Sequence, residues 1–212
     1  MDKIDELASA LAKLPGIGPR QGKRFVYYLL ASPAAERTKL AELIASLGKE
    51  VRQCPECLRF FNGSHASSCR YCTDTHRDDT QLLIVEKDQD LAAIERAGTY
   101  KGHYFVLGGV ITLSGKGAIR EKELMRRIEK GLKAKTAEGG SPGAQGALRE
   151  VVLALSATSE GEHTADRVRQ LLAPYRDHLT VSTLGRGLAT GSELEYSDAE
   201  TLRAALAGRK ET

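Results

Sequence analysis

Residues 82–86 read Leu82-Leu83-Ile84-Val85-Glu86, four large apolar side chains followed at once by a carboxylate. A short unbroken apolar run of this kind is typical of a strand that is buried on both faces. Open α/β sheets bind their ligands at the carboxyl ends of the strands, and Glu86 would occupy such an end. The stretch therefore predicts a central strand and marks Glu86 as a candidate functional residue.

From residue 80 onward the sequence alternates between short apolar strands and amphipathic helices. Strands are predicted at 82–86, 103–108, 150–155 and 178–184, and helices at about 89–97, 120–133 and 163–173. This order predicts an α/β fold with a mostly parallel sheet and right-handed crossovers, flanked by helices. Residues 136–147 are rich in glycine and hold no large apolar side chain, which predicts a flexible linker or surface loop.

The composition is that of a globular protein, with 28% charged and 41% hydrophobic residues. No apolar run approaches the ~20 residues that a membrane-spanning helix needs. Residues 1–12 alternate charged and apolar side chains, unlike the apolar core of a secretory signal. We therefore expect a soluble, cytoplasmic protein.

Two predicted helices, 2–14 and 19–31, are joined by a turn that contains Gly16 and Gly18. Glycines let the backbone come close to a phosphate, and the free N–H groups at the start of the second helix favour an anion. The order of helix, Gly-x-Gly turn and helix predicts a helix-hairpin-helix.

Basic residues gather behind this turn. No acid occurs between Glu6 and Glu36, whereas the second helix begins with Arg20, Lys23 and Arg24. Such a localised positive field predicts contact with the phosphates of nucleic acid. The alternative is a tight helix–helix turn with a solvated basic face.

A third predicted helix runs from about Pro33 to Val51, with Ser32 as its N-cap. Its inner stripe is expected to consist of Leu40, Leu43, Ile44, Leu47 and Val51. A helical arm of about 50 residues has little core of its own in which to bury such stripes. We therefore expect a homo-oligomer in which the arms of neighbouring subunits pack together.

All four cysteines of the chain occur in two Cys-x-x-Cys pairs, formed by Cys54, Cys57, Cys69 and Cys72. In a cytosolic protein this spacing indicates zinc, and disulfides are disfavoured. Four thiolates complete a tetrahedral ion and leave no position for water, so the predicted zinc is structural. His65 and His76 are alternative ligands, but the four thiolates already saturate the metal.

Four arginines surround this cysteine region: Arg52, Arg59, Arg70 and Arg77. They either contact phosphate or only keep the loop solvated, and the sequence favours neither interpretation.

A second group of carboxylates follows the predicted strand 150–155. If this strand lies beside 82–86, then Glu86, Glu160 and Glu162 converge at the carboxyl edge of the sheet. Three carboxylates there could hold Mg²⁺, a hard cation that prefers oxygen ligands.

The alternative for two of these acids is a local role. Ser159-x-x-Glu162 matches a capping box for the helix predicted at 163–173. The negative charge of Glu160 would compensate the positive N-terminal end of the helix dipole. No cap explains Glu86, which ends a buried strand.

The C-terminal residues predict a loop, a short strand and a final helix. The loop covers 185–192, the strand 193–196, and the helix 198–207, with Ser197 as its N-cap and Gly208 as its stop.

The order of these parts resembles the RecR family of bacterial recombination mediators, from about Leu11 to Arg209. The motifs that carry the resemblance are Leu14-Pro15-Gly16-Ile17-Gly18-Pro19, Cys54/Cys57/Cys69/Cys72, Val85-Glu86, Gly102-x-Tyr104-Phe105-Val106-Leu107-x-Gly109, Thr158-x-Glu160-Gly161-Glu162-x-Thr164, Gly191-x-x-Leu194-Glu195-Tyr196, Thr201-Leu202 and Ala207-Gly208-Arg209.

The resemblance implies four parts. These are a helix-hairpin-helix domain at 1–52, a four-cysteine zinc finger at 53–78, a Toprim domain at 79–184, and a C-terminal element for oligomerisation or partner binding at 185–212. By position, Arg20 and Arg24 match the basic residues of the family's hairpin, and Lys23 is their neighbour. Catalytic Toprim enzymes carry Asp-x-Asp where this chain has Glu160-x-Glu162.

The resemblance also implies a role without a catalytic step. Members of the family work in recombinational repair with RecO and RecF partners. They help to load RecA onto single-stranded DNA that is coated by single-strand-binding protein, and they form rings of four subunits.

This chain departs from the family pattern at Val110–Lys116, at Ser156-Ala157-Thr158 and at Gly22, where a small alanine is usual. The first departure concerns residues that could contact partners.

Three functions follow from these observations. The first is a mediator that binds single- and double-stranded DNA without reading its sequence. The second is a Mg²⁺-dependent Toprim nuclease that uses Glu86 as acid and base. The third is a zinc scaffold for a protein partner.

Overall fold

The computed structural model describes residues 2–63, 66–133, 147–188 and 190–209. The chain divides into two compact units, Met1–Arg52 and Gln53–Thr212. No helix among these described residues is long and apolar enough to cross a membrane.

The first unit consists of three helices, α1 (Lys3–Leu11), α2 (Pro19–Ala31) and α3 (Ala34–Glu50). Helix α2 has the predicted bounds, because Pro19 fixes its first turn and Gly18 precedes it as N-cap. Helix α3 differs from its prediction, since its N-cap is Pro33 instead of Ser32. Ser32 ends α2, where its backbone N–H and its hydroxyl both donate to the carbonyl of Tyr28.

The apolar stripe of α3 is not an inner one in this chain. None of the residues of α3 is buried, and the Ile44 side chain is 61% exposed. The expectation of an inner stripe is therefore wrong for the single chain. Two residues of the stripe, Leu40 and Ile44, line an apolar groove of about 380 Å³ that α3 shares with α1 and α2.

The strand β1 (Val51–Gln53) spans the boundary between the units, and the cysteine region continues in the second unit with the strand β2 (Phe60–Asn62) and the short helix α4 (Arg70–Thr73). The sheet strands are β3 (Asp78–Val85), β4 (Gly102–Val106), β5 (Glu150–Ala154) and β6 (Thr180–Thr183). The helices between and after them are α5 (Asp88–Ala97), α6 (Glu121–Lys133), α7 (Ser159–Leu172) and α8 (Ala199–Ala207).

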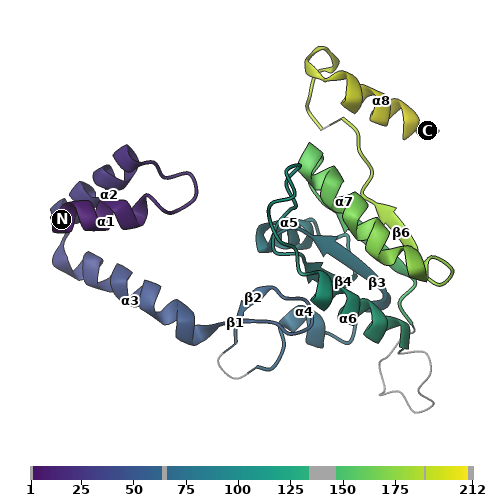
Figure 1. Ribbon diagram of the computed structural model, residues 1–212, viewed down its shortest axis with the longest axis horizontal. Coiled ribbons are helices and arrows are strands. Elements are labelled where there is room, and N and C mark those ends of the chain that lie inside the picture. The colour runs from purple at the N-terminus through teal and green to yellow at the C-terminus, as the bar shows by residue number, and fades with distance from the viewer. Residues whose placement is uncertain (1, 64–65, 134–146, 189, 210–212) are drawn as a thin grey trace. The chain divides into compact units, whose positions relative to one another are not determined.

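The four sheet strands are all parallel and lie in the order β4-β3-β5-β6 (Figure 1). The predicted stretch is thus a central strand: Ile84 of β3 lies between Phe105 of β4 and Leu153 of β5. The α/β fold and the parallel sheet flanked by helices are confirmed.

The side chains of β3 alternate between two apolar cores because successive residues of a strand point to opposite faces. Leu82 and Ile84 pack with residues of α6 and α7, including Ile128 and Val168. The opposite core holds Leu83, Val85, Leu91, Tyr71 and three cysteines, Cys54, Cys57 and Cys69. The cysteine region therefore covers one face of the sheet together with α5.

Three local predictions were wrong. Helix α7 begins at Ser159, four residues earlier than expected, with Thr158 as its N-cap. Residues Leu194–Tyr196 form a 3-10 helix instead of a strand, and Asp198, not Ser197, caps α8. The linker predicted at 136–147 lies outside the described residues except for Ala147.

Candidate metal centre and nucleic-acid interface

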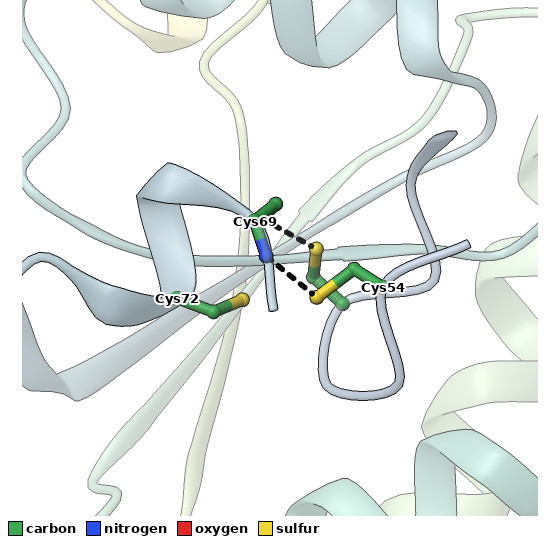
Figure 2. Close-up of side chains that lie close together, drawn as sticks. Cys54, Cys69 and Cys72 are labelled. Atoms are coloured by element: carbon green, nitrogen blue, oxygen red, sulfur yellow. Dashed lines mark hydrogen bonds between the residues drawn. The ribbon is translucent and has the colours of Figure 1, made fainter. Parts of the chain in front are cut away.

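The four cysteines meet at one point. Their sulfur atoms all lie within 4.8 Å of one another, and the Cys57 and Cys69 sulfurs are 3.5 Å apart. Figure 2 shows the side chains of Cys54, Cys69 and Cys72 directed toward one another, with the Cys69 backbone N–H donating to the Cys54 sulfur at 3.4 Å. The sequence prediction that brings these four residues together is confirmed.

This geometry fits a metal ion with four thiolate ligands. Zn–S bonds of about 2.3 Å in a tetrahedron place the sulfurs about 3.8 Å apart, which matches the observed cluster. Hydrogen bonds with the neighbouring sulfurs shift the pKa values of the cysteines in opposite directions. The bond with Cys57 is the largest cause of the lowered pKa of Cys54, and the bond with Cys54 is the largest cause of the raised pKa of Cys72. The thiols thus compete for negative charge, and a divalent cation would stabilise all four thiolates together.

The first cysteine pair turns sharply and is tied to the sheet. Leu58 adopts a left-handed conformation, with φ at 60°, and its N–H donates to the carbonyl of Cys54 at 2.9 Å. The Cys57 carbonyl accepts from Val106 N–H at 2.9 Å, and the Leu58 carbonyl accepts from the Arg120 guanidinium at 2.9 Å. These hydrogen bonds therefore attach the candidate metal site to the edge strand β4.

The predicted alternative ligands play no part in the cluster that the structure describes. His76 is exposed and pairs with Asp74, with its Nδ1 atom 3.3 Å from the carboxylate. His65 lies outside the described residues.

Three of the four arginines of the cysteine region stack on the ring of Tyr71. Arg59, Arg70 and Arg77 each place the guanidinium within 5 Å of the Tyr71 ring centre, at 4.6, 4.8 and 4.8 Å. The Nη2 atom of Arg77 also donates to both carboxylate oxygens of Glu95, at 2.8 and 2.9 Å. Arg70 and Arg77 therefore have roles within the fold. No spacing in the sequence predicts that both stack on the Tyr71 ring.

The hairpin glycines have different reasons for being glycine. Gly16 has φ at +77°, a left-handed conformation that favours glycine. Gly18 is extended, with φ at −85°, and a Cβ there would meet nothing within 4 Å. No protein atom in the described chain explains Gly18, which leaves the space beside the start of α2 free for a ligand.

A third glycine, Gly22, brings the two helices of the hairpin together. It is buried, and a Cβ on it would lie 2.5 Å from the carbonyl oxygen of Ala8. A side chain at this position would therefore push α1 and α2 apart.

The three predicted basic residues of α2 are exposed, but they are not equivalent. Lys23 pairs with Asp5 of α1, with 3.0 Å between Nζ and Oδ1. Arg24 makes a long hydrogen bond of 3.4 Å to Gln21, its neighbour on the helix. Arg20 has no ion pair in the described structure, so its guanidinium is the one most available to an anion.

A groove of about 470 Å³ runs beside this helix start and is lined by Arg20, Lys23 and also Lys13. Arg24 lies outside its lining. Lys13 belongs to the same acid-free stretch as the predicted residues, so the charge pattern of the sequence is enough to predict that Lys13 contributes to the basic surface.

Glu86 is buried, with 7% of its surface exposed, and its carboxylate is occupied by a neighbour. Its Oε1 atom accepts hydrogen bonds of 2.6 Å from both the backbone N–H and the hydroxyl of Ser156. The Ser156 carbonyl approaches Gly161 so closely that a Cβ on Gly161 would lie 2.0 Å from its oxygen. Glu86 thus joins the ends of β3 and β5.

The predicted convergence of Glu86 with Glu160 and Glu162 is not found. Among the described residues the four cysteines are the only group of three or more potential ligands close enough to hold a metal ion. Glu162 instead pairs with Arg186 of the C-terminal segment, and Arg186 reaches Glu200 of α8 at 3.6 Å.

The predicted capping box is also replaced. The hydroxyl of Thr158 accepts from Gly161 N–H at 3.1 Å, so Thr158 caps α7 and Ser159 is the first helical residue. The first turn then contains Glu160 and Glu162, where carboxylates favour the helix dipole.

Three segments of the chain match known family models. Residues 4–47 match the helix-hairpin-helix of RecR, residues 80–184 match the Toprim domain, and residues 187–210 match the C-terminal region of RecR.

Similar proteins cover nearly the whole chain. The Recombination protein RecR of Cutibacterium acnes is 37% identical over 209 residues, which span 97% of this chain and 94% of that protein. The chain belongs to the RecR family. Proteins of the same name from Dehalococcoides mccartyi and Thermobifida fusca are 35% and 36% identical over 210 residues, covering 98% of this chain and 93% and 96% of theirs.

In the sequence, the cysteine cluster lies between the helix-hairpin-helix segment and the Toprim segment, and the Toprim match covers the four parallel strands apart from the start of β3. Family membership does not by itself assign Arg120, Ser156 and Arg186, which make the contacts described above. Their partners are far away in the sequence, and no periodicity or spacing signals such pairs.

Proposed function

We propose that this protein is a DNA-binding recombination mediator that acts in recombinational repair. The observation that carries the proposal is a RecR-type hairpin whose Gly18 leaves open space beside three exposed cations. Sequence identity of 35% to 37% with proteins named Recombination protein RecR supports the same role.

The hairpin would bind DNA through its phosphates. The first-turn N–H groups of α2 have no acceptor within the helix, and Arg20, Lys23 and Arg24 add positive charge beside them. No base-reading side chain is needed for such contacts, so single- and double-stranded DNA would both bind without sequence preference. Gly16 shapes the turn and Gly18 keeps it accessible.

The test replaces two cations of the hairpin. The Arg20→Ala/Arg24→Ala variant should bind DNA more weakly and should lower the slope of log affinity against log salt by about 2, roughly one for each lost phosphate contact. The matched control is Lys122→Ala/Arg126→Ala, which removes two exposed cations at the same spacing from α6. Equal salt slopes for the two variants would remove the hairpin from the mechanism.

We propose that the metal held by the four cysteines is Zn²⁺ and that its role is structural. A set of four thiolates suits zinc and leaves no open position for water. The bonds from Val106 and Arg120 to the cysteine loop support a role in fixing this loop on the sheet.

We further propose that the protein has no catalytic step of its own. The contacts of Glu86 with Ser156 and of Glu162 with Arg186 support this interpretation, because one oxygen of each carboxylate already has a protein partner and the two do not form a shared metal site. Purified protein incubated with DNA or RNA and Mg²⁺ or Mn²⁺ should leave the nucleic acid intact. Cleavage that disappears in Glu86→Gln would instead establish the alternative, a Toprim nuclease.

The expected partners are RecO- and RecF-type proteins, with which the chain would help to load RecA onto single-stranded DNA in the cytoplasm. The expected assembly is a ring of four subunits. Exposed apolar side chains in both terminal regions support oligomerisation: Leu30, Leu40, Leu43, Ile44 and Leu47, and Leu188, Leu194, Tyr196 and Leu206. Light scattering should give a mass of four times the 23.0 kDa chain, and a purely monomeric protein would contradict the ring.

A further inference from the structure

A second basic cavity lies in the sheet unit, and nothing in the hairpin mechanism uses it. The cavity has a volume of about 540 Å³ and opens where β3 and β4 end, between β2 and the start of α5. Its lining includes three cations, Arg59, Lys87 and Arg120, and one acid, Asp88. Small-molecule sites in proteins typically measure about 300–1,000 Å³, so the cavity is large enough for a nucleotide.

Arg120 is fixed in the wall of this cavity. Its Nη1 atom donates to the carbonyls of Leu58 and Val106, both at 2.9 Å. Gly108 has φ at +89°, and a Cβ there would lie 2.9 Å from the Arg120 Nε atom. Glycine at this position therefore gives the guanidinium room, and the Nε and Nη2 atoms have no hydrogen bond within the described structure.

Arg59 supplies a second guanidinium with unused donors. Its Nε atom is buried and has no hydrogen-bond partner among the described residues. The guanidinium lies 4.6 Å from the centre of the Tyr71 ring, which holds its plane but satisfies no N–H group. Its Nη1 and Nη2 groups also make no hydrogen bond in the described structure, so they are the donors that an anion in the cavity would use.

Lys87 and the helix start complete the positive side. Lys87 is exposed and is the N-cap residue of the ten-residue helix α5, whose first turn carries N–H groups without intrahelical acceptors. The single lining acid is engaged, since Oδ1 of Asp88 accepts from the Phe60 N–H at 2.8 Å. Glu86, one residue before Lys87, directs its carboxylate to Ser156. The cavity is therefore net positive.

The rim offers a flat apolar surface as well. The Phe60 side chain is 55% exposed and lines the cavity, and Gln89 adds an amide that can both donate and accept. An aromatic ring beside two guanidinium groups suits a base attached to a phosphate, because bases stack on aromatic side chains and guanidinium groups bind phosphate.

We propose that this cavity binds a nucleoside 5′-phosphate, with the phosphate on Arg59, Lys87 and Arg120 and the base on Phe60. The same chemical group is presented by a free nucleotide and by the phosphorylated 5′ end of a DNA strand. The site is separate from the hairpin and goes beyond the proposed function.

The first experiment measures binding of deoxyadenosine 5′-monophosphate to the full-length protein by calorimetry at low ionic strength. Lys87→Gln should weaken this binding about tenfold, the effect of losing one charge-assisted contact. The matched control is Lys101→Gln, an exposed lysine just before β4, at the other end of that strand. No saturable binding at millimolar nucleotide, or equal affinities for the two variants, would overturn the site.

A second variant tests the base contact. Phe60→Ala should weaken deoxyadenosine 5′-monophosphate about tenfold, as expected for a lost stacking contact, and leave orthophosphate unchanged. The hydrogen bond from Phe60 to Asp88 uses the backbone N–H and persists in this variant. An unchanged nucleotide affinity would exclude Phe60 as the base platform.

Competition then separates the two sources of the phosphate, in the Arg20→Ala/Arg24→Ala background so that the hairpin contributes little. A 5′-phosphorylated oligonucleotide that displaces the nucleotide better than its 5′-hydroxyl twin would assign a strand end, and equal weak displacement would assign the free nucleotide. If the Arg20→Ala/Arg24→Ala variant loses DNA binding but still binds the nucleotide, the two sites are independent. If the wild-type protein binds DNA but not the nucleotide, the cavity proposal is wrong and the hairpin proposal stands.

Discussion

Ser156 donates two hydrogen bonds of 2.6 Å to one carboxylate oxygen of Glu86, one from its backbone N–H and one from its hydroxyl. The two residues follow the ends of neighbouring strands, β3 and β5. A residue that the sequence marks as a candidate catalyst therefore serves as a connection between the central strands. Its burial at 7% exposure makes this connection a contribution to stability.

Replacing Glu86 should therefore destabilise the fold. Glu86→Ala leaves the Ser156 donors unpaired and should lower the free energy of unfolding by about 2 kcal/mol. Glu86→Gln should cost less, because its amide oxygen can still accept from Ser156. Urea denaturation of both variants and of Ser156→Ala measures the coupling, and full additivity of the Glu86 and Ser156 substitutions would contradict a direct bond.

The cysteine cluster predicts a dependence of stability on metal. One zinc ion per chain should be found by elemental analysis, and a chelator should lower the melting temperature because the cysteines form part of the core beside β3 and β4. Binding should weaken as the pH falls, since each thiolate ligand must lose a proton.

The variant Cys57→Ser should lose the zinc, whereas Ser67→Ala, an exposed substitution in the same loop, should retain it. A metal-free protein with an unchanged melting temperature would show that the cluster is not needed for folding.

Much of the sheet could be predicted from the sequence because its strands are short apolar runs that must be buried on both faces. Ile84 and its neighbours leave few alternatives to a central parallel strand. The Cys-x-x-Cys pairs are equally direct, since this spacing is typical of four-thiolate metal sites. Helix α2 was predicted to the residue because Pro19 and the preceding glycine define its start.

The acidic edge could not be predicted in the same way. The partner of Glu86 is a serine 70 positions away, and that of Glu162 is Arg186, so both contacts depend on the tertiary fold. The cap of α7 was predicted one residue too late, at Ser159, because Thr158 and Ser159 are adjacent residues of the same capping class. The contact from Gly161 N–H to the Thr158 hydroxyl identifies Thr158 as the cap.

A salt bridge between α6 and α7 predicts a specific loss of stability in acid. Arg167 donates to Glu121 at 2.8 and 2.9 Å, and its hydrogen bonds lower the pKa of that carboxyl group below its ordinary value. A lowered pKa in the folded state means that the stabilisation is complete above the unfolded pKa, about 4.3, and is lost as the pH falls through the folded value.

The difference in unfolding free energy between the wild type and Glu121→Gln should therefore shrink between neutral and acidic pH. Both side chains are partly exposed, so the effect should be small. Glu123→Gln, on the same helix and without an ion pair in the described structure, is the control. A pH-independent difference for Glu121→Gln would rule out the ion pair as its cause.

Gly22 predicts a cost for an alanine at this position. Because a Cβ would come within 2.5 Å of the Ala8 carbonyl oxygen, Gly22→Ala must push α1 away from α2. We expect a loss of about 1–3 kcal/mol in the stability of the hairpin, the usual cost of overpacking. The matched control is Gly48→Ala in α3, where a Cβ would meet nothing within 4 Å and alanine should stabilise the helix by about 0.5–1 kcal/mol. Thermal unfolding should separate the two variants in opposite directions, and a stabilising Gly22→Ala would show that α1 can shift without loss of packing.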